Sequence, residues 1–187
     1  MMDAAIRAPS GGNSQNWRWL TVADPDTRAT LGPLYRDAWE ELQNTLYKGR
    51  REAAEASGDT QTVRVVKSTQ WLADNFETVP LWVFALHRND PSGASIYPAV
   101  WTLMLAARGM GIGTCLTTIL GIFEQDAVFD LLGIPGDKGW SIAATVECGY
   151  PLGRWGVATR EPAHEVAYAE HWGQAPAWTA DDPLFSM

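Results

Sequence analysis

The segment from Ile96 to Met110 constrains the fold of this chain more than any other feature. Its spacing predicts a helix, yet apolar residues fill nearly every position and leave almost no polar face. A helix that is apolar on all sides is stable in water only when it is buried. In a chain of 187 residues, cover on every side is hard to supply from within. We therefore expect the helix to lie against a sheet on one side and a partner subunit on another.

Length and charge narrow the class of protein. A chain of 187 residues without a Pro/Ser-rich or charged linker predicts a single domain over 1–187. The formal net charge of -8 argues against a nucleic-acid partner, because that binding requires basic side chains that neutralise phosphates. The apolar runs are shorter than the roughly 20 residues that cross a bilayer, and the amino end has no export signal. We expect a cytoplasmic protein with no membrane partner.

The two cysteines, Cys115 and Cys148, have no metal-ligand spacing around them and fit a reducing compartment. Unpaired cysteine is among the most frequently buried residue types. We expect both to be buried free thiols.

Hydrophobic periodicity predicts helices around a sheet of few strands. Helices are expected over 26–57, 62–75 and 123–132, with Gly58 and Gly133 as their ends, and short strands over 81–86 and 140–148. An apolar, strand-like run also follows Gly113. Together these segments predict an α+β fold of two or three layers.

A loop near the start of the chain concentrates turn-forming and polar residues. Positions 8–17 read Ala-Pro-Ser-Gly-Gly-Asn-Ser-Gln-Asn-Trp. Pro9 and the two glycines let the backbone turn with its N–H groups exposed, while the serine, asparagine and glutamine side chains offer donors and acceptors. Such a loop suits the edge of a planar polar ligand, and composition alone leaves open an ordinary turn into a strand. Trp17 is expected to pack beneath the loop and support it.

Other chemistry-bearing motifs are weak. The glycines between Gly109 and Gly113 follow a helix and precede a strand, the reverse of the order in a dinucleotide-binding fingerprint. The preference of glycine for helix ends favours a helix stop followed by a tight connection. The sequence has no Walker motif and no Gly-x-Ser-x-Gly elbow, and its three histidines have no neighbours that mark a metal or a nucleophile. The carboxylates are dispersed, without a spaced acid/base pair.

The loop resembles the flavin-binding segment of the nitroreductase family of FMN enzymes, whose members carry a similar Ala-Pro-Ser-Gly-Gly-Asn-Ser-Gln-Pro-Trp run. Four further blocks follow in the order found in that family. They are Ser95-Ile96-Tyr97-Pro98-Ala99 with 103–114, Leu132-Gly133-Ile134-Pro135, Gly149-Tyr150-Pro151 and Arg160-Glu161-Pro162. Five blocks in one order over most of the chain argue against chance.

The resemblance implies a mostly antiparallel sheet flanked by helices, completed by an intertwined homodimer with FMN at the subunit interface. It also implies an FMN-dependent oxidoreductase that takes a hydride from NAD(P)H and passes electrons to a small, electron-poor acceptor such as a nitroaromatic or a quinone. Because the flavin performs this chemistry itself, no catalytic side chain is expected. The sequence does not name the acceptor or choose between NADH and NADPH.

The resemblance also implies which residues contact FMN. The side chains of Ser10, Asn13 and Gln15 resemble the family's ligands to the ribityl chain and pyrimidine edge, with Pro9 and Gly11 shaping the turn. In relatives, the backbone that follows the counterpart of the glycine-rich turn starting at Gly109 lies along the flavin ring near N5. In this chain those positions are Gly113, Thr114, Cys115 and Leu116.

Arg160 resembles the arginine that meets the FMN phosphate in the family. Its permanently charged, bidentate head suits that ligand, although a surface arginine is the alternative on the residue type alone. Arg154 is a weaker candidate for the same role.

The sequence departs from the family pattern in several places. Family members normally carry an Arg-rich segment of the Arg-Arg-Ser-x-Arg kind before the loop, and this sequence starts almost at the loop. Asn16 stands where proline is usual, Trp101-Thr102 where many relatives have Gln-Asn, and Ala158 where a lysine often stands. A start upstream of Met1, a reduced cofactor site, or a partner that supplies the missing groups would each explain the difference.

Two alternative functions therefore stay open. One is a nitroreductase-fold protein with reduced flavin binding that acts as a ligand-binding or interaction protein. The other is a specialised flavin oxidase or dehalogenase of the same fold.

Overall fold

A computed structural model describes residues 1–153, 158 and 160–180. The chain divides into two compact units, Met1–Tyr150 and Pro151–Met187, and each is described by itself. The second unit has one short 3-10 helix, η4 (Ala163–Glu165), and a contact between the rings of Tyr168 and Trp172, whose centroids are 4.8 Å apart. The single domain expected over 1–187 therefore stays a prediction.

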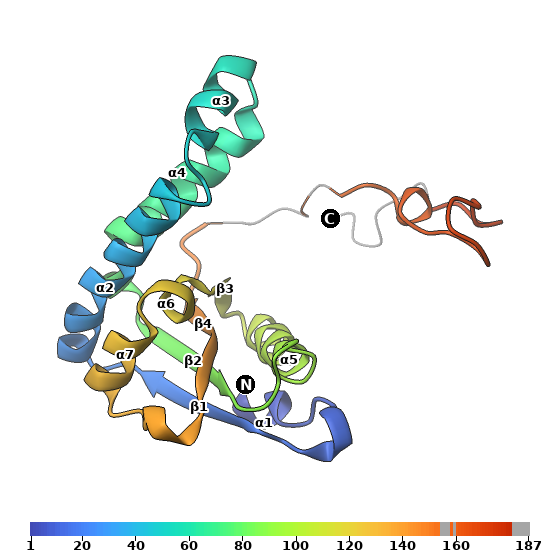
Figure 1. Ribbon diagram of the computed structural model, residues 1–187. Helices are drawn as coiled ribbons and strands as arrows, with labels where there is room; N and C mark the ends of the chain where they lie inside the picture. The colour runs from blue at the N-terminus through green and yellow to red at the C-terminus, as the bar shows by residue number, and fades with distance from the viewer. Residues whose placement is uncertain (154–157, 159, 181–187) are drawn as a thin grey trace. The chain divides into compact units, whose positions relative to one another are not determined.

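The first unit is built on a four-stranded antiparallel sheet in the order β1-β2-β4-β3 (Figure 1). Its strands are β1 (Trp17–Val22), β2 (Leu81–His87), β3 (Gly113–Thr117) and β4 (Ser141–Gly149). The strands expected over 81–86 and 140–148 are confirmed, because they coincide with β2 and β4. These two central strands are also the most buried and the most apolar of the sheet. The mostly antiparallel α+β fold is confirmed as well.

One face of the sheet is covered by α2 (Pro25–Asn44), α6 (Ile119–Phe123) and α7 (Gln125–Leu132) (Figure 1). A ladder of aromatic rings forms the centre of this core. The rings of Tyr35 and Phe76 stack with centroids 3.7 Å apart, and the Trp82 ring lies 4.1 Å from that of Phe76. Phe76 belongs to η2 (Phe76–Thr78), the 3-10 turn that leads into β2.

The opposite face is covered by α5 (Ile96–Gly109) and the short helix α1 (Met2–Ala5). Five residues of α5 are buried against the sheet: Ile96, Ala99, Val100, Leu103 and Ala107. The expected cover by the sheet is therefore confirmed. The other side of α5 is open to solvent in the single chain, because Tyr97, Trp101 and Leu105 are 41%, 59% and 53% exposed. Cover by a partner subunit stays a prediction.

The helix expected over 26–57 is interrupted. Helix α2 ends at Asn44, and α3 (Arg50–Ser57) begins only after a turn in which Gly49 adopts a left-handed φ of 71°. The hydroxyl of Thr45 donates to the carbonyl oxygen of Glu41 and closes the last turn of α2. The expectation of one continuous helix is thus wrong at these residues.

The remaining helix expectations are close to what the structure shows. Helix α4 (Thr60–Asp74) matches the segment expected over 62–75, and α7 preceded by α6 replaces the single helix over 123–132. Gly58 and Gly133 end their helices in the left-handed conformation, as predicted. A short 3-10 turn, η3 (Gly136–Lys138), leads from α7 toward β4. Within the described part of the chain, none of the helices is both long enough and apolar enough to cross a membrane.

Candidate functional site

The loop before β1 has an unusual backbone. A 3-10 turn, η1 (Gly11–Asn13), forms its centre, and Gly12 has a φ of 58°. Asn13 and Gln15 also adopt positive φ values, 54° and 50°, which non-glycine residues seldom do. Backbone conformations of this kind persist where surrounding contacts impose them, and they cluster at binding sites.

Hydrogen bonds within the loop bring the predicted ligand side chains together. The hydroxyl oxygen of Ser10 accepts from the backbone N–H of Gln15 at 3.1 Å, and the side-chain amide of Gln15 donates to Oδ1 of Asn13 at 3.0 Å. Asn13 and Gln15 are exposed, and Ser10 is half-buried. The three side chains therefore form one polar group at the surface, and their contact with FMN stays a prediction.

The loop is fixed to the rest of the first unit at both ends. The backbone N–H of Gly11 donates to the hydroxyl of Ser95, the residue that precedes α5, at 3.2 Å. On the other side, Trp17 is only 6% exposed, and the carbonyl of Asn16 accepts from the backbone N–H of Arg88 at 3.0 Å. Trp17 is thus buried directly after the loop, in agreement with its expected supporting role.

The second predicted segment, Gly113 to Leu116, forms most of β3 at the edge of the sheet. It pairs with β4 so that Gly113 lies opposite Gly149 and Cys115 opposite Glu147. Because β3 is an edge strand, its outer side presents backbone groups that no other strand of the sheet uses. The edge position also explains why Cys115 is exposed, so its expected burial is wrong, whereas Cys148 is buried as expected.

The loop and β3 lie at opposite ends of α5 within one chain (Figure 1). Ser95 joins the loop to the start of the helix, and the N–H of Ile112 donates to the carbonyl of Ala107 where the helix ends and β3 begins. Fourteen helical residues at 1.5 Å each separate these points by about 21 Å. The structure thus brings the loop residues together, and brings Gly113, Thr114, Cys115 and Leu116 together, but keeps the two groups apart.

Arg160 belongs to the second unit and is exposed. Its predicted place beside the phosphate of FMN stays a prediction. Arg154, the weaker candidate, lies outside the described residues.

A buried carboxyl group lies beside β3, on the face of the sheet that α2 covers. Glu147 is 4% exposed and stands between Trp82 of β2 and Cys115 of β3. Its Oε1 accepts from the hydroxyl of Thr117 at 3.0 Å, while Oε2 has no hydrogen-bond partner among the described residues. Burial raises the pKa of this carboxyl from 4.5 to about 8. Sequence reasoning missed Glu147, although a lone glutamate within an apolar strand was a usable signal.

The neighbours of Glu147 are also perturbed. Although Cys115 is exposed as a whole residue, the protein atoms around its thiol partly desolvate it. This desolvation and, to a lesser extent, the charge of Glu147 raise the pKa of the Cys115 thiol to about 11, and the same two causes raise the pKa of Tyr35. Reactive cysteines require the thiolate, so the thiol of Cys115 is poorly suited to be a nucleophile at neutral pH. No group of three potential metal ligands occurs among the residues that the structure describes.

Comparison with known proteins gives the same family that the loop suggested. Residues 1–150 match the nitroreductase family. Protein DrgA of Synechocystis sp. is 30% identical over 141 residues, which make up 72% of this chain and 64% of DrgA. The chain thus spans slightly less than two thirds of the length of that relative.

Solved structures share the fold at low identity. A nitroreductase with bound FMN from Bacteroides fragilis has a TM-score of 0.61 and 19% identity, with 90% of this chain and 84% of that chain covered. An iodotyrosine deiodinase bound to FMN and 3-iodo-L-tyrosine has a TM-score of 0.62 and 21% identity, with coverage of 85% and 83%. Because the family match extends from the loop through the end of β4, this chain belongs to the nitroreductase family.

Proposed function

We propose that this protein is an FMN-dependent oxidoreductase that takes a hydride from NAD(P)H and reduces a small, electron-poor acceptor such as a nitroaromatic or a quinone. The observation that carries the proposal is the loop before β1. Its strained Asn13 and Gln15 gather three polar side chains at the surface within a segment that belongs to the nitroreductase family. Bound FMN would supply the redox chemistry, and the protein would bind and orient it.

The polar groups of this chain suit different parts of FMN. The loop side chains of Ser10, Asn13 and Gln15 offer donors and acceptors for the ribityl chain and the pyrimidine edge. The outer edge of β3, from Gly113 to Leu116, offers backbone groups to the flat ring. The guanidinium of Arg160 has the charge and the shape to bind the phosphate.

A homodimer would unite the two halves of this site. The pyrimidine edge and N5 belong to one fused ring system, which is far shorter than the 14-residue helix that separates the loop from β3. A second copy with its α5 packed antiparallel would place the loop of one subunit near β3 of the other. The exposed row of Tyr97, Trp101 and Leu105, spaced at i, i+4 and i+8, gives that helix an apolar surface for the contact.

Titration of the purified protein with FMN tests the proposal. We expect saturable binding with a shift of the flavin absorption spectrum, followed by oxidation of NADH or NADPH that depends on an added quinone or nitroaromatic. Riboflavin, which lacks the phosphate, is the matched control ligand. Absence of spectral change in excess FMN would refute the proposal.

One observation bears on the alternative of a protein with reduced flavin binding. Arg7 lies just before the loop, but its guanidinium is already engaged with Asp3 at 3.5 Å. A chain that binds FMN no better than riboflavin, and that oxidises neither nicotinamide, would support this alternative. Product analysis with halogenated phenols separates the third candidate, a specialised flavin oxidase or dehalogenase.

A further inference from the structure

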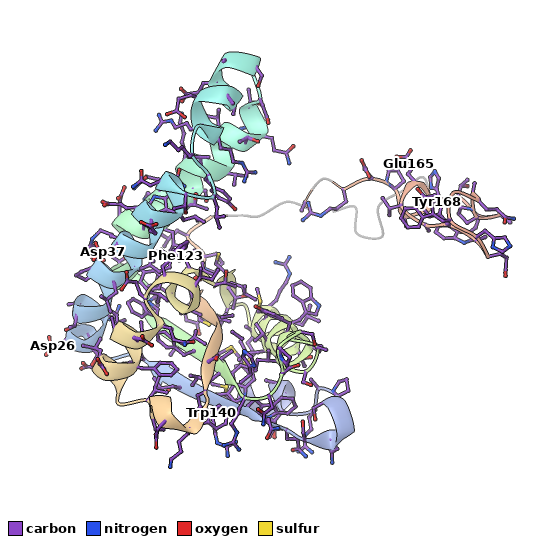
Figure 2. All side chains as sticks on the ribbon, viewed as in Figure 1. Asp26, Asp37, Phe123, Trp140, Glu165 and Tyr168 are labelled. Carbon is purple, nitrogen blue, oxygen red and sulfur yellow. The ribbon has the colours of Figure 1, made fainter. Side chains whose placement is uncertain are left out.

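Two arginines converge on one indole ring at the β1 end of the sheet. The guanidinium carbons of Arg18 and Arg88 lie 5.2 Å and 5.0 Å from the centroid of Trp140. Arg18 belongs to β1, Arg88 follows β2, and Trp140, labelled in Figure 2, stands just before β4. Cation–π contacts of this length hold both guanidinium groups against one ring despite their mutual repulsion.

Neither arginine forms an ion pair with a carboxylate among the residues that the structure describes. Arg18 donates through Nη1 to the carbonyl of Trp17 at 2.7 Å, and the Nε of Arg88 is buried without a hydrogen-bond partner. The chain has 22 acidic and 14 basic residues, so carboxylates are plentiful elsewhere. The Nε of Arg88 is shielded from solvent, whereas Arg18 is exposed and has no carboxylate partner among the described residues, so its guanidinium is available to an anion from solution.

An apolar groove opens beside these cations. It has a volume of about 220 Å³ and is lined by Arg18 together with Leu20, Leu86, Leu132, Ile134 and Trp140. A larger hollow of about 360 Å³ lies between α2 and α4, but its lining is polar with charges of both signs, and its Arg36 is paired with Glu77 at 3.0 Å. The smaller groove is therefore the one that combines an apolar floor with unpaired positive charge.

We propose that this groove binds a small carboxylate with an aromatic or branched aliphatic body, about the size of benzoate. The guanidinium of Arg18 binds the carboxylate oxygens, and Leu20, Leu86 and Ile134 contact the apolar body. Arg88 does not line the groove, but its guanidinium lies against the Trp140 ring and adds positive charge behind it. The volume falls below the range of about 300 to 1,000 Å³ that is usual for drug-sized ligands, which limits the body to a single ring or its equivalent.

This groove is separate from the segments proposed to contact FMN. Leu20 and Leu86 contribute to the core on the α2 and α7 face, whereas Trp17, which anchors the loop, contributes to the core on the α5 face. Strand β3 lies at the opposite edge of the sheet from β1. The inference does not depend on flavin binding.

Binding of 4-fluorobenzoate to the full chain, measured both with and without added FMN, tests the inference, with fluorine NMR and calorimetry as readouts. We expect one saturable site per chain. Arg18→Gln should weaken binding about tenfold or more, Arg88→Gln should weaken it less, and the double variant should abolish it. Arg64→Gln, which removes an exposed arginine of α4, is the matched control and should bind like the unmodified chain.

Two further ligands test both parts of the proposed carboxylate. Neutral fluorobenzene and inorganic phosphate should each compete poorly, because one lacks the charge and the other lacks the apolar body. Equal competition by either would overturn the inference, as would unchanged binding in Arg18→Gln or no saturable binding at all. The inference would also be overturned if the unmodified chain did not bind benzoate and Arg88→Gln changed the solution mass. That result would mean that a second copy of the chain occupies the groove. If Arg88→Gln fails to fold, the exposed Arg18 decides the result.

Discussion

Replacing Glu147 with glutamine should change how the stability of this protein depends on pH. The carboxyl has an ordinary pKa of 4.5 and a pKa of about 8 in the folded chain, because burial disfavours its charged form. Its neutral form is therefore favoured by folding. The associated stability is fully present below pH 4.5 and is lost as the pH rises toward 8, because the unfolded chain ionises first.

The expected size of the effect follows from the shift in pKa. At 1.36 kcal/mol per unit, the free energy of unfolding should fall by about 5 kcal/mol between pH 4.5 and 8 through this group, with about 3 kcal/mol of it lost by pH 7. Glutamine keeps an acceptor for the hydroxyl of Thr117 and does not ionise. It replaces the unpartnered Oε2 with a buried amide donor, at a cost of roughly 1 to 3 kcal/mol.

Together, the two effects make the substitution destabilising at low pH and stabilising at high pH. Glu147→Gln should be less stable than the unmodified chain at pH 5 and more stable at pH 9, so the two stability curves should cross. Urea unfolding at fixed protein concentration, repeated from pH 5 to 9, measures the difference. Glu52→Gln, an exposed substitution on α3, is the control and should run parallel to the unmodified chain. A constant difference between Glu147→Gln and the unmodified chain over this range would show that Glu147 does not titrate there.

Three further outcomes are expected. Trp101→Asp should lower the solution mass, measured by light scattering, from that of two chains to that of one. Trp71→Asp changes an equally exposed tryptophan of α4 and should leave the mass unchanged. Equal masses for both variants would contradict the proposed contact through α5. Ser10→Ala removes the acceptor for the Gln15 N–H and should weaken FMN binding about tenfold in a spectroscopic titration, with Ser57→Ala of α3 as the control. Cys115, with its pKa raised from 9.0 to about 11, should react with iodoacetamide about a hundredfold more slowly than a free cysteine at pH 7.5, as measured by mass spectrometry.

Local pattern predicts most elements of this fold because their apolar residues repeat with the period of the structure they form. It fails where an apolar residue continues the pattern without being buried. Leu46 extends the spacing of α2 by one further step, yet it lies past the end of the helix and is 70% exposed. The glycine that permits the turn, Gly49, comes four residues after the last helical turn has closed at Thr45. Nothing in the spacing alone marks that break.

The residue clusters of this structure also differ in how far the sequence could predict them. The loop side chains are within six positions of one another, so a short motif could predict their grouping. Arg18 and Arg88 are 70 positions apart and meet because β1 pairs with β2 in a register that sets Trp17 opposite His87. Glu147 becomes a buried partner of Cys115 only through the register of β3 and β4. Such clusters depend on cross-strand pairing, which periodicity does not specify.

The separation of the loop from β3 leads to a test of the two-subunit site. Asn13→Ala should damage the loop half, and Gly113→Phe should place a side chain where β3 is expected to meet the ring. If each flavin contacts the loop of one subunit and β3 of the other, a mixed dimer of the two variants contains one intact site and one with both changes. Unfolding and reassembly of the mixture should then restore FMN binding to about a quarter of the sites, although neither variant binds well alone. If both halves came from one chain, every site in the mixture would carry one change and no binding would return.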